Sequence, residues 1–459
     1  MDRDMFAVPK RIASAAVALF MSATLAVQPA MAQRSISFIR DTEIEHILRT
    51  YSTPILQVAG LVPESVTIAM VNDDSLNAFV AGGQNMFFHT GFLMDTTLEE
   101  LIGVAAHETG HIAGGHLARA GDAMSNAATI ASIFTLLGMA AAIGAGRTDV
   151  GIGVMGGGQE AALRTFFAFT RGQEGAADEA AMQYLEKLGW SSEGLLKMMQ
   201  RLAGQELLPE SRQVEYVRTH PLTRNRIEAI RNFVETKSQN NGKRLPEEFY
   251  TKHERMVAKL MGFMRPELAL RHYAATDTSI PARYARAIAL YQRGNVREAL
   301  VMTDGLIAQE KDNAYFHELK GQILFEDGRA ADAVIPYRES VRLDPESGLL
   351  RNALGHALLE VGNDRVLNEA ITHLLAAARL EHNSALTWRL LSSAYSRADM
   401  QPQLAYARAE EALSRGDIRA AKYHADRAER MLPAGSPEWI RAQDIRVMVE
   451  SHPVSREYN

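Results

Sequence analysis

The sequence of 459 residues contains no cysteine. This absence excludes disulfide bridges and thiolate metal sites, which leaves histidine and carboxylate side chains as the candidate metal ligands. A strong excess of either charge is also missing, because the net charge is only −6 at pH 7. Such a weak charge gives no electrostatic argument for nucleic acid as a partner.

Low-complexity tracts are missing as well, and the composition is that of an ordinary globular protein, 47% hydrophobic and 23% charged. A chain of this length exceeds what one hydrophobic core usually supports. We therefore expect two or three domains.

The N-terminus has the pattern of an export signal. Lys10 and Arg11 precede an apolar run, residues 12–27, and the small-x-small sequence "AMA" ends at Ala32. We predict a signal peptide over residues 1–32 and, together with the helical repeats below, a location in a bacterial periplasm. The alternative is an uncleaved membrane anchor, because the run approaches the lower limit for crossing a bilayer.

The rest of the chain divides in two. Over residues 33–270 strand-like and helical patterns mix, whereas residues 281–459 have helical period nearly throughout. The polar, turn-forming stretch "KSQNNGKRLPEEF", Lys237 to Phe249, is predicted to be a loop at the end of the first part. We predict an α+β, mainly helical protein: a domain with a small sheet, then an all-α domain.

The second part is repetitive. Gly294, Gly328 and Gly362 lie 34 residues apart, each in a short turn between two amphipathic segments, which is the period of tetratricopeptide repeats. The third copy carries about three extra residues before Ala370. Such units stack into a solenoid whose concave surface binds an extended segment or a partner; the alternative is a solenoid that serves only as a spacer.

The sequence "HETGH" follows a predicted helix start, the capping-box pair Thr97 and Glu100. His107 and His111 are one turn apart, so both imidazoles project from one face of this helix. Glu108 lies beside them and can reach a metal-bound water without being a ligand. This is the H-E-x-x-H signature of zinc hydrolases.

A catalytic zinc site needs three protein ligands and an open position. In "EGAADEAA", Glu174 and Asp178 stand four residues apart on a predicted helix whose other face is apolar. Glu174 can complete the ligand set, and Asp178 can accept the second ring N–H of a zinc histidine. Two alternatives remain: a solvated acidic pair, or His116 as the third ligand, although it comes one residue early for the metzincin pattern.

Two strand-like stretches, "VTIAMVND" and "QNMFFHTGF", flank "NAFV" upstream of the zinc motif. An exposed sheet edge here could bind the backbone of an extended substrate by strand addition. The alternative is an ordinary sheet that covers the zinc helix.

The sequences "HETGH", "EGAAD", "NAFVAGGQNMFFHTGFL" and "RTHPLTRNRIEAI" together closely resemble the gluzincin peptidases of the HtpX and CAAX-prenyl-endopeptidase group. The resemblance implies a zincin-type metalloprotease domain with one zinc ion per chain. It assigns the metal to His107, His111 and Glu174, the general base to Glu108, and the orientation of a zinc histidine to Asp178.

The resemblance also assigns a role to His220 of "RTHPLTRNR". In the family this histidine approaches the metal, as an extra ligand in a closed state or as a donor to the oxyanion of the reaction. The alternative is a plain helix start at His220-Pro221, because proline suits a first helical turn.

For an exported member fused to repeats, the resemblance implies an endopeptidase that acts on misfolded or stalled outer-membrane β-barrel proteins, with help in their assembly as a further role. The β-barrel assembly machinery is the partner expected at the repeats. The apolar segment 128–146 is predicted to dock on the protease core, with peripheral contact to the outer membrane as the alternative. The competing function is a periplasmic chaperone or scaffold with little proteolytic activity, against which the intact Glu108 argues.

Overall fold

The computed structural model describes residues 37–451 apart from 82, 117–118, 120–169, 206–207, 209–212, 215 and 218–219. The predicted signal peptide and the apolar segment 128–146 lie outside the described residues. Among the helices that are described, none is both long and apolar enough to cross a membrane.

A four-stranded sheet with the strand order β1-β2-β4-β3 organises the first part of the chain. Its strands are β1 (Phe38–Ile39), β2 (Thr67–Val71), β3 (Ala78–Ala81) and β4 (Asn85–His89). β2 and β4 are parallel, whereas β1 and β3 pair antiparallel at the two edges. The strands predicted in "VTIAMVND" and "QNMFFHTGF" are therefore confirmed, and the stretch "NAFV" between them contributes most of β3.

The last of these predictions extended too far. The strand ends at His89, and the helix α3 (Thr90–Asp95) starts directly after it. The physical reason is a turn held by the carbonyl of Asp73, which accepts hydrogen bonds from the hydroxyl of Thr90 and the backbone N–H of Gly91.

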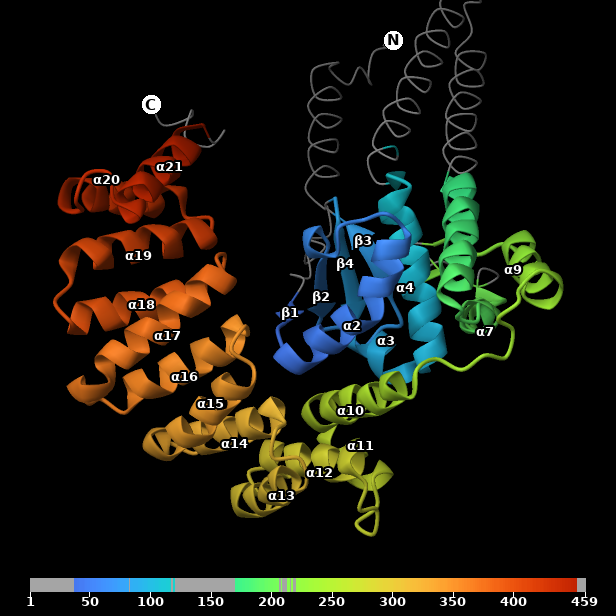
Figure 1. The fold of residues 1–459 in the computed structure, drawn as a ribbon, viewed down its shortest axis with the longest axis horizontal. Coiled ribbons are helices and arrows are strands. Elements are labelled where there is room, and N and C mark those ends of the chain that lie inside the picture. Colours follow the sequence, from blue (N-terminus) through green and yellow to red (C-terminus); the bar gives the residue numbers. More distant parts are fainter. Residues whose placement is uncertain are drawn as a thin grey trace, which may run out of the picture. The chain divides into compact units, whose positions relative to one another are not determined.

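The helices α2 (Thr42–Val58) and α4 (Leu98–Ala113) pack on the sheet (Figure 1). α7 (Glu193–Leu202) packs on α4, α9 (Arg224–Thr236) packs on α7, and a further helix spans residues 170–188. Met70, Met86 and Phe88 are fully buried and share a core with Leu101 and Val104 of α4. Because strand side chains alternate between faces, this burial places the core on a single side of the sheet.

The helix α4 begins as the sequence predicts. The hydroxyl of Thr97 accepts a hydrogen bond from the N–H of Glu100, and the carboxylate of Glu100 accepts one from the N–H of Thr97. Such a cap stabilises a helix by about 0.5–2 kcal/mol, so it fixes the start of the helix that carries the zinc motif.

The helix α10 (Glu247–Met264) joins the two parts of the chain, followed by the short α11 (Pro266–His272). The loop predicted over Lys237–Phe249 therefore ends at Pro246. Phe249 is 4% exposed and packs on the ring of Tyr51. Burial of this aromatic side chain favours a helix that begins before Phe249, and the predicted loop is therefore shorter. Residues of α10 also pack against the first repeat helix, so one hydrophobic core extends across the junction.

The repeats are antiparallel helix pairs that follow one another along the chain (Figure 1). The helices are α12 (Ile280–Gln292), α13 (Val296–Gln309), α14 (Ala314–Glu326), α15 (Ala330–Leu343), α16 (Gly348–Glu360), α17 (Leu367–Leu380), α18 (Ala385–Arg397), α19 (Gln401–Ser414), α20 (Ile418–Met431) and α21 (Pro437–Ser451). The α+β, mainly helical fold with an all-α repeat region is confirmed.

The turn within each of the first three pairs is made by a glycine in the left-handed region, at Gly294, Gly328 and Gly362. The fourth turn places Asp399 there, three residues later than the 34-residue period requires. This shift along the sequence equals the length of the short 3-10 helix Asp364–Val366 before α17, which accounts for the extra residues of the third copy.

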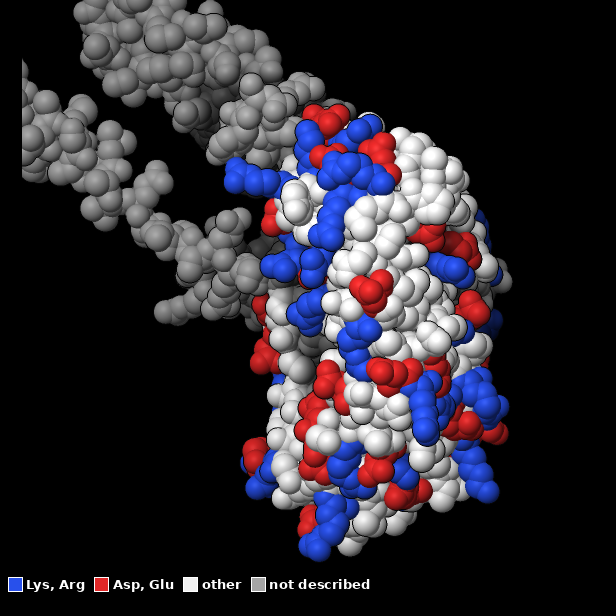
Figure 2. Space-filling view, turned by 90° about the vertical axis from the view of Figure 1, so that its left-hand side faces the viewer, with Lys and Arg blue, Asp and Glu red and all other residues white. Residues whose placement is uncertain are grey.

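Figure 2 shows both signs of charge interspersed over the side it displays, as expected from the weak net charge.

Candidate metal centre and catalytic site

The zinc-motif helix and the helix over residues 170–188 cross at Gly110. A Cβ atom on Gly110 would lie 2.8 Å from the carbonyl oxygen of Ala177, closer than real Cβ contacts. Only glycine therefore allows this approach of the two backbones. The close crossing brings Glu174 and Asp178 against the histidine face of α4.

Four buried side chains converge at this crossing: His107, His111, Glu174 and His220, whose ligand atoms all lie within 4.8 Å of one another. The Nε2 atoms of His107 and His111 are 3.1 Å apart. Each of them is 3.4 Å from a carboxylate oxygen of Glu174. The structure thus brings together the three proposed ligands and the histidine of the His-Pro sequence.

Asp178 lies behind His107, with its Oδ1 atom 2.9 Å from the Nδ1 atom of that ring. This contact directs Nε2 of His107 toward the cluster, as expected for an aspartate that orients a metal-bound histidine. Arg226 of α9 in turn donates two hydrogen bonds to Asp178, from Nε at 2.6 Å and from Nη2 at 2.9 Å.

The Nη1 atom of Arg226 lies 2.9 Å from Glu174 Oε2 and donates to the carbonyl of Pro221 at 2.8 Å. One guanidinium therefore contacts the candidate ligand Glu174, the orienting Asp178 and the segment that carries His220. No sequence motif pointed to a role for Arg226. The only signal was an arginine on the apolar side of a helix, next to the buried Ile227 and Ile230.

The electrostatics of the cluster favour a positive charge at its centre. Burial alone would raise the pKa of Glu174, but His220, His107 and His111 hold it well below its usual value. Burial alone would lower the pKa of His107, yet hydrogen bonds to Asp178 and Glu174 raise it to about 10. His111 lacks a contact with Asp178, and burial lowers its pKa to about 4.

Glu108 is fully buried, and neither of its carboxylate oxygens accepts a hydrogen bond among the described residues. Burial raises the pKa of this carboxyl group. Its Oε1 atom lies 3.4 Å from Nε2 of His220. Glu108 is thus beside the cluster and outside the set of converging ligand atoms, which is where a general base belongs.

His220 is held in place from two sides. Its ring stacks on that of Tyr216, with centroids 4.7 Å apart, and its backbone N–H donates to the carbonyl of Tyr216. Its Nδ1 atom lies 3.3 Å from Glu174 Oε1. Tyr216 was also missed by the sequence analysis, because nothing in a lone tyrosine four residues before a histidine signals a stacked pair.

His116 does not join the four converging side chains. Its Nδ1 atom lies 2.9 Å from Nδ1 of His111, on the side of the ring that faces away from the cluster. This position corresponds to the alternative of packing and hydrogen bonding behind the site, and not to the third ligand of the metzincin pattern.

The donor set fits a zinc ion. Two imidazole nitrogens and one carboxylate are the protein ligands of a common class of catalytic zinc site. The raised pKa of His107 means that the buried carboxylates already favour a cation here, and deprotonated imidazoles would bind a metal in place of a proton.

Comparisons with known proteins point the same way. Residues 39–234 match the model of peptidase family M48. A protein of Yersinia pestis named "Beta-barrel assembly-enhancing protease" is 26% identical over 90% of this chain and 84% of its own length. The protein of the same name from Escherichia coli (strain K12) is 23% identical over 82% of this chain and 77% of its own length.

Among solved structures, a thermophilic TPR protein of Thermus thermophilus covers 40% of this chain and 99% of its own, with 15% identity and a TM-score of 0.23. That likeness is too weak to argue from, so the repeat architecture rests on the helix pairs described above. The family match and the relatives indicate a metalloprotease.

Proposed function

We propose that this metalloprotease, which carries a peptidase M48 domain over residues 39–234, is a zinc-dependent endopeptidase of the bacterial periplasm. Its proposed substrates are misfolded or stalled outer-membrane β-barrel proteins, whose assembly it also assists. The observation that carries the peptidase role is the buried cluster of His107, His111 and Glu174 beside Glu108, whose carboxylate accepts no hydrogen bond among the described residues. The names of the relatives support the substrate class.

The catalytic roles follow from the positions of the side chains. When bound to His107, His111 and Glu174, a zinc ion would polarise the peptide carbonyl and acidify water. Glu108 takes the proton of the attacking water and later delivers it to the departing amine. Asp178 holds the His107 ring and Arg226 holds the Glu174 carboxylate in the orientation that metal binding requires.

We assign two states to His220. A ring nitrogen of His220 lies within 4.8 Å of the potential ligand atoms of His107, His111 and Glu174, and we propose that this arrangement is a closed resting state. During reaction the same ring can donate a hydrogen bond to the oxygen on which negative charge develops. A ligand that binds the open state more tightly would shift the protein out of the closed state.

Substrate backbone is proposed to add to β3, an edge of the sheet that contacts α4. The N–H of His89 donates to the carbonyl of Asn77, which fixes the alternation of the β3–β4 pair. By this alternation the backbone N–H and C=O groups of Ala78 and Val80 point away from β4, toward the side of β3 where no described strand pairs with it. An extended chain could pair with them whatever its side chains, which suits unfolded β-rich substrates.

The two parts of the chain are proposed to have different roles. Residues 33–270 would carry the peptidase and residues 281–459 would bind partners, among them the β-barrel assembly machinery. The segment 128–146, which lies outside the described residues, is proposed to dock on the protease core, with peripheral contact to the outer membrane as the alternative.

Metal removal tests the peptidase role. The purified protein, incubated with an unfolded outer-membrane β-barrel protein, is expected to cleave it, and a zinc chelator is expected to abolish cleavage. Added zinc should restore it, because the ligands are proposed to be preformed by the fold. Cleavage that continues in metal-free protein, or substrate that stays intact with the zinc-loaded wild-type protein, would contradict the proposal.

A further inference from the structure

A groove of about 590 Å³ runs along the first helices of three successive repeats, α14, α16 and α18. Glu318, Asn352 and Leu386 line it from these helices, and Ile39 and Arg40 line it from the end of β1. None of these residues belongs to the cluster at α4, so the groove is separate from the catalytic site.

Two acceptor atoms in this groove lack a hydrogen bond. Asn352 is 8% exposed, and its side-chain oxygen accepts no hydrogen bond among the described residues. The same holds for Oε2 of Glu318. Its nearest cation, Lys259, is 3.7 Å away and lies closer to Asp41, at 2.7 Å. Buried acceptors without partners are rare in folded proteins, so both atoms are suited to a ligand that brings donors.

The charged groups that line the groove leave it acidic. Arg40 is neutralised by Glu45 and Glu381, with contacts of 2.6 and 2.9 Å. Asp41 is paired with Lys259. These pairs leave the exposed Glu326 without an ion pair among the described residues, and leave Glu318 with only Lys259, at 3.7 Å, which Asp41 shares. Burial raises the pKa of Glu318 to about 7.

Two further titratable groups line the groove, His356 and Tyr337. Burial lowers the pKa of the His356 imidazole and raises the pKa of the Tyr337 phenol, so both are neutral at pH 7. The remaining walls are apolar. Phe263, Phe325 and Leu349 line the groove, and Leu386 is 41% exposed beside them.

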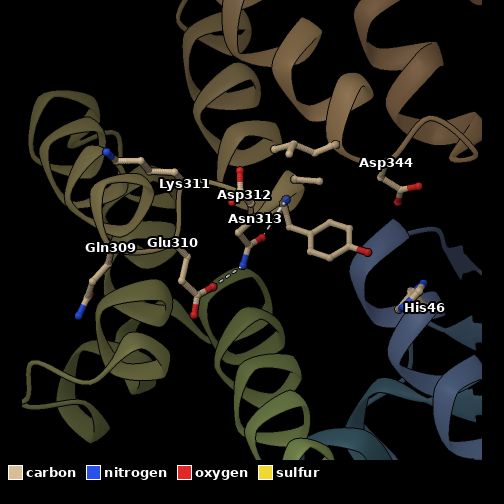
Figure 3. Close-up of a pocket in the computed structure, with 10 residues that line it drawn as sticks. His46, Gln309, Glu310, Lys311, Asp312, Asn313 and Asp344 are labelled. Carbon is tan, nitrogen blue, oxygen red and sulfur yellow. Dashed lines mark hydrogen bonds between the residues drawn. The ribbon is translucent and has the colours of Figure 1, made fainter.

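The cleft in Figure 3 provides a contrast, because the side chains of Asn313 and Glu310 at its centre are bonded to each other. Asn313 donates to Glu310 at 2.7 Å and accepts from the N–H of Tyr315. Glu310 also receives two hydrogen bonds from Arg255, at 2.8 and 2.9 Å. These bonds make the cleft a joint between elements, whereas the groove at Asn352 has acceptors to offer.

We propose that this groove binds an extended, lysine- or arginine-bearing segment of an unfolded polypeptide, as a capture site for the substrate of the peptidase proposed above. A backbone N–H of the segment would bond to Asn352, and its cationic group would reach Glu318 and Glu326. Neighbouring apolar side chains would cover Phe325 and Leu386. Only an extended chain presents free backbone donors and side chains together.

The position of the groove also sets a spacing, which rests on the proposed peptidase function. Ile39 belongs to β1, and β3 lies at the opposite edge of the sheet. A chain paired with β3 lies four strand spacings from β1, roughly 19 Å at about 4.8 Å each. A chain that occupies the groove and also pairs with β3 needs at least about six residues between the two points, at about 3.3 Å per residue.

Peptide binding to the full-length Glu108→Gln protein tests the capture site without cleavage. The probes are three fluorescent 12-residue peptides that are identical except for one central lysine, glutamine or glutamate, and anisotropy gives the Kd. We expect the lysine peptide to bind at least about tenfold more tightly than the other two, because it adds a charge-assisted hydrogen bond. Equal affinity for the lysine and glutamate peptides would overturn the proposal.

Variants locate the binding. Glu318→Gln and, independently, Asn352→Ala should each weaken binding of the lysine peptide about tenfold, with melting temperature as the check on folding. Asp344→Asn, which removes a carboxylate from the Figure 3 cleft, is the matched control and should bind as the parent does. Equal losses in the control would overturn the assignment to the groove.

Two other outcomes are informative. Self-association of the unliganded protein that Glu318→Gln abolishes would make the groove an interface between copies and would overturn the proposal. Lysine-dependent binding by a chain whose zinc-loaded wild type cleaves nothing would support the groove while contradicting the peptidase function, so the two failures can be told apart.

Discussion

The Glu108→Gln variant should bind zinc as the wild type does and lose proteolysis by about 10²–10⁴-fold, the usual contribution of general acid–base catalysis. Glu108 is fully buried, accepts no hydrogen bond from the described residues and lies 3.4 Å from His220. Glutamine keeps the shape of this side chain but cannot take a proton from water. The measurements are kcat on unfolded casein and zinc content by atomic absorption.

Glu100→Gln is the matched control on the same helix. Glutamine can replace glutamate in a capping box, so this variant should keep both zinc and activity. Near-normal proteolysis by a zinc-loaded Glu108→Gln protein would contradict the mechanism, because no other described carboxylate is placed to do the same work beside the cluster.

Glu174→Ala should lose far more zinc affinity than His116→Ala. Glu174 has a carboxylate oxygen 3.4 Å from each of the two ligand nitrogens, whereas His116 contacts only the back of His111. Loss of a residue that orients a ligand typically costs about 10–100-fold in metal affinity, and loss of a ligand costs more. Competition with a chelator of known zinc affinity measures both variants.

Glu174→Gln accompanies this comparison as the variant that keeps the side-chain volume next to Arg226, so that a weak zinc site can be separated from a disturbed fold. A larger loss of zinc affinity in His116→Ala than in both Glu174 variants would contradict the ligand assignment. It would favour the metzincin interpretation of the sequence, with His116 as the third ligand.

Local patterns account for what the sequence could predict. The start of α4 depends on residues three apart, and the shared face of His107 and His111 depends on helical period, so both can be read from neighbours in the chain. The turn glycines of the repeats follow from backbone conformation at a fixed spacing. Glu174 and Asp178 could be proposed because two motif histidines need a third ligand and an orienting group.

Long-range packing accounts for what the sequence could not predict. Arg226 meets Asp178 across 48 residues of chain, and its position depends on how α9 packs. The end of the loop before α10 depends on burial of Phe249 against Tyr51, again a tertiary contact. The first repeat helix, α12, shares a hydrophobic core with α10, and Ile288 packs against Gly262. No local sequence pattern near Gly262 predicts this contact. The groove at Asn352 forms only where helices of three successive repeats pack side by side, which no single repeat sequence specifies.

X-ray absorption at the zinc edge of the resting wild-type protein is the most direct test of the zinc site and its closed state. The account predicts one zinc per chain with three imidazoles, from His107, His111 and His220, and one carboxylate, from Glu174. The imidazole number should fall to two in His220→Ala, with zinc still bound. A resting wild-type site with two imidazoles, one carboxylate and water would contradict the closed state, and zinc bound without His107 and His111 would contradict the site itself.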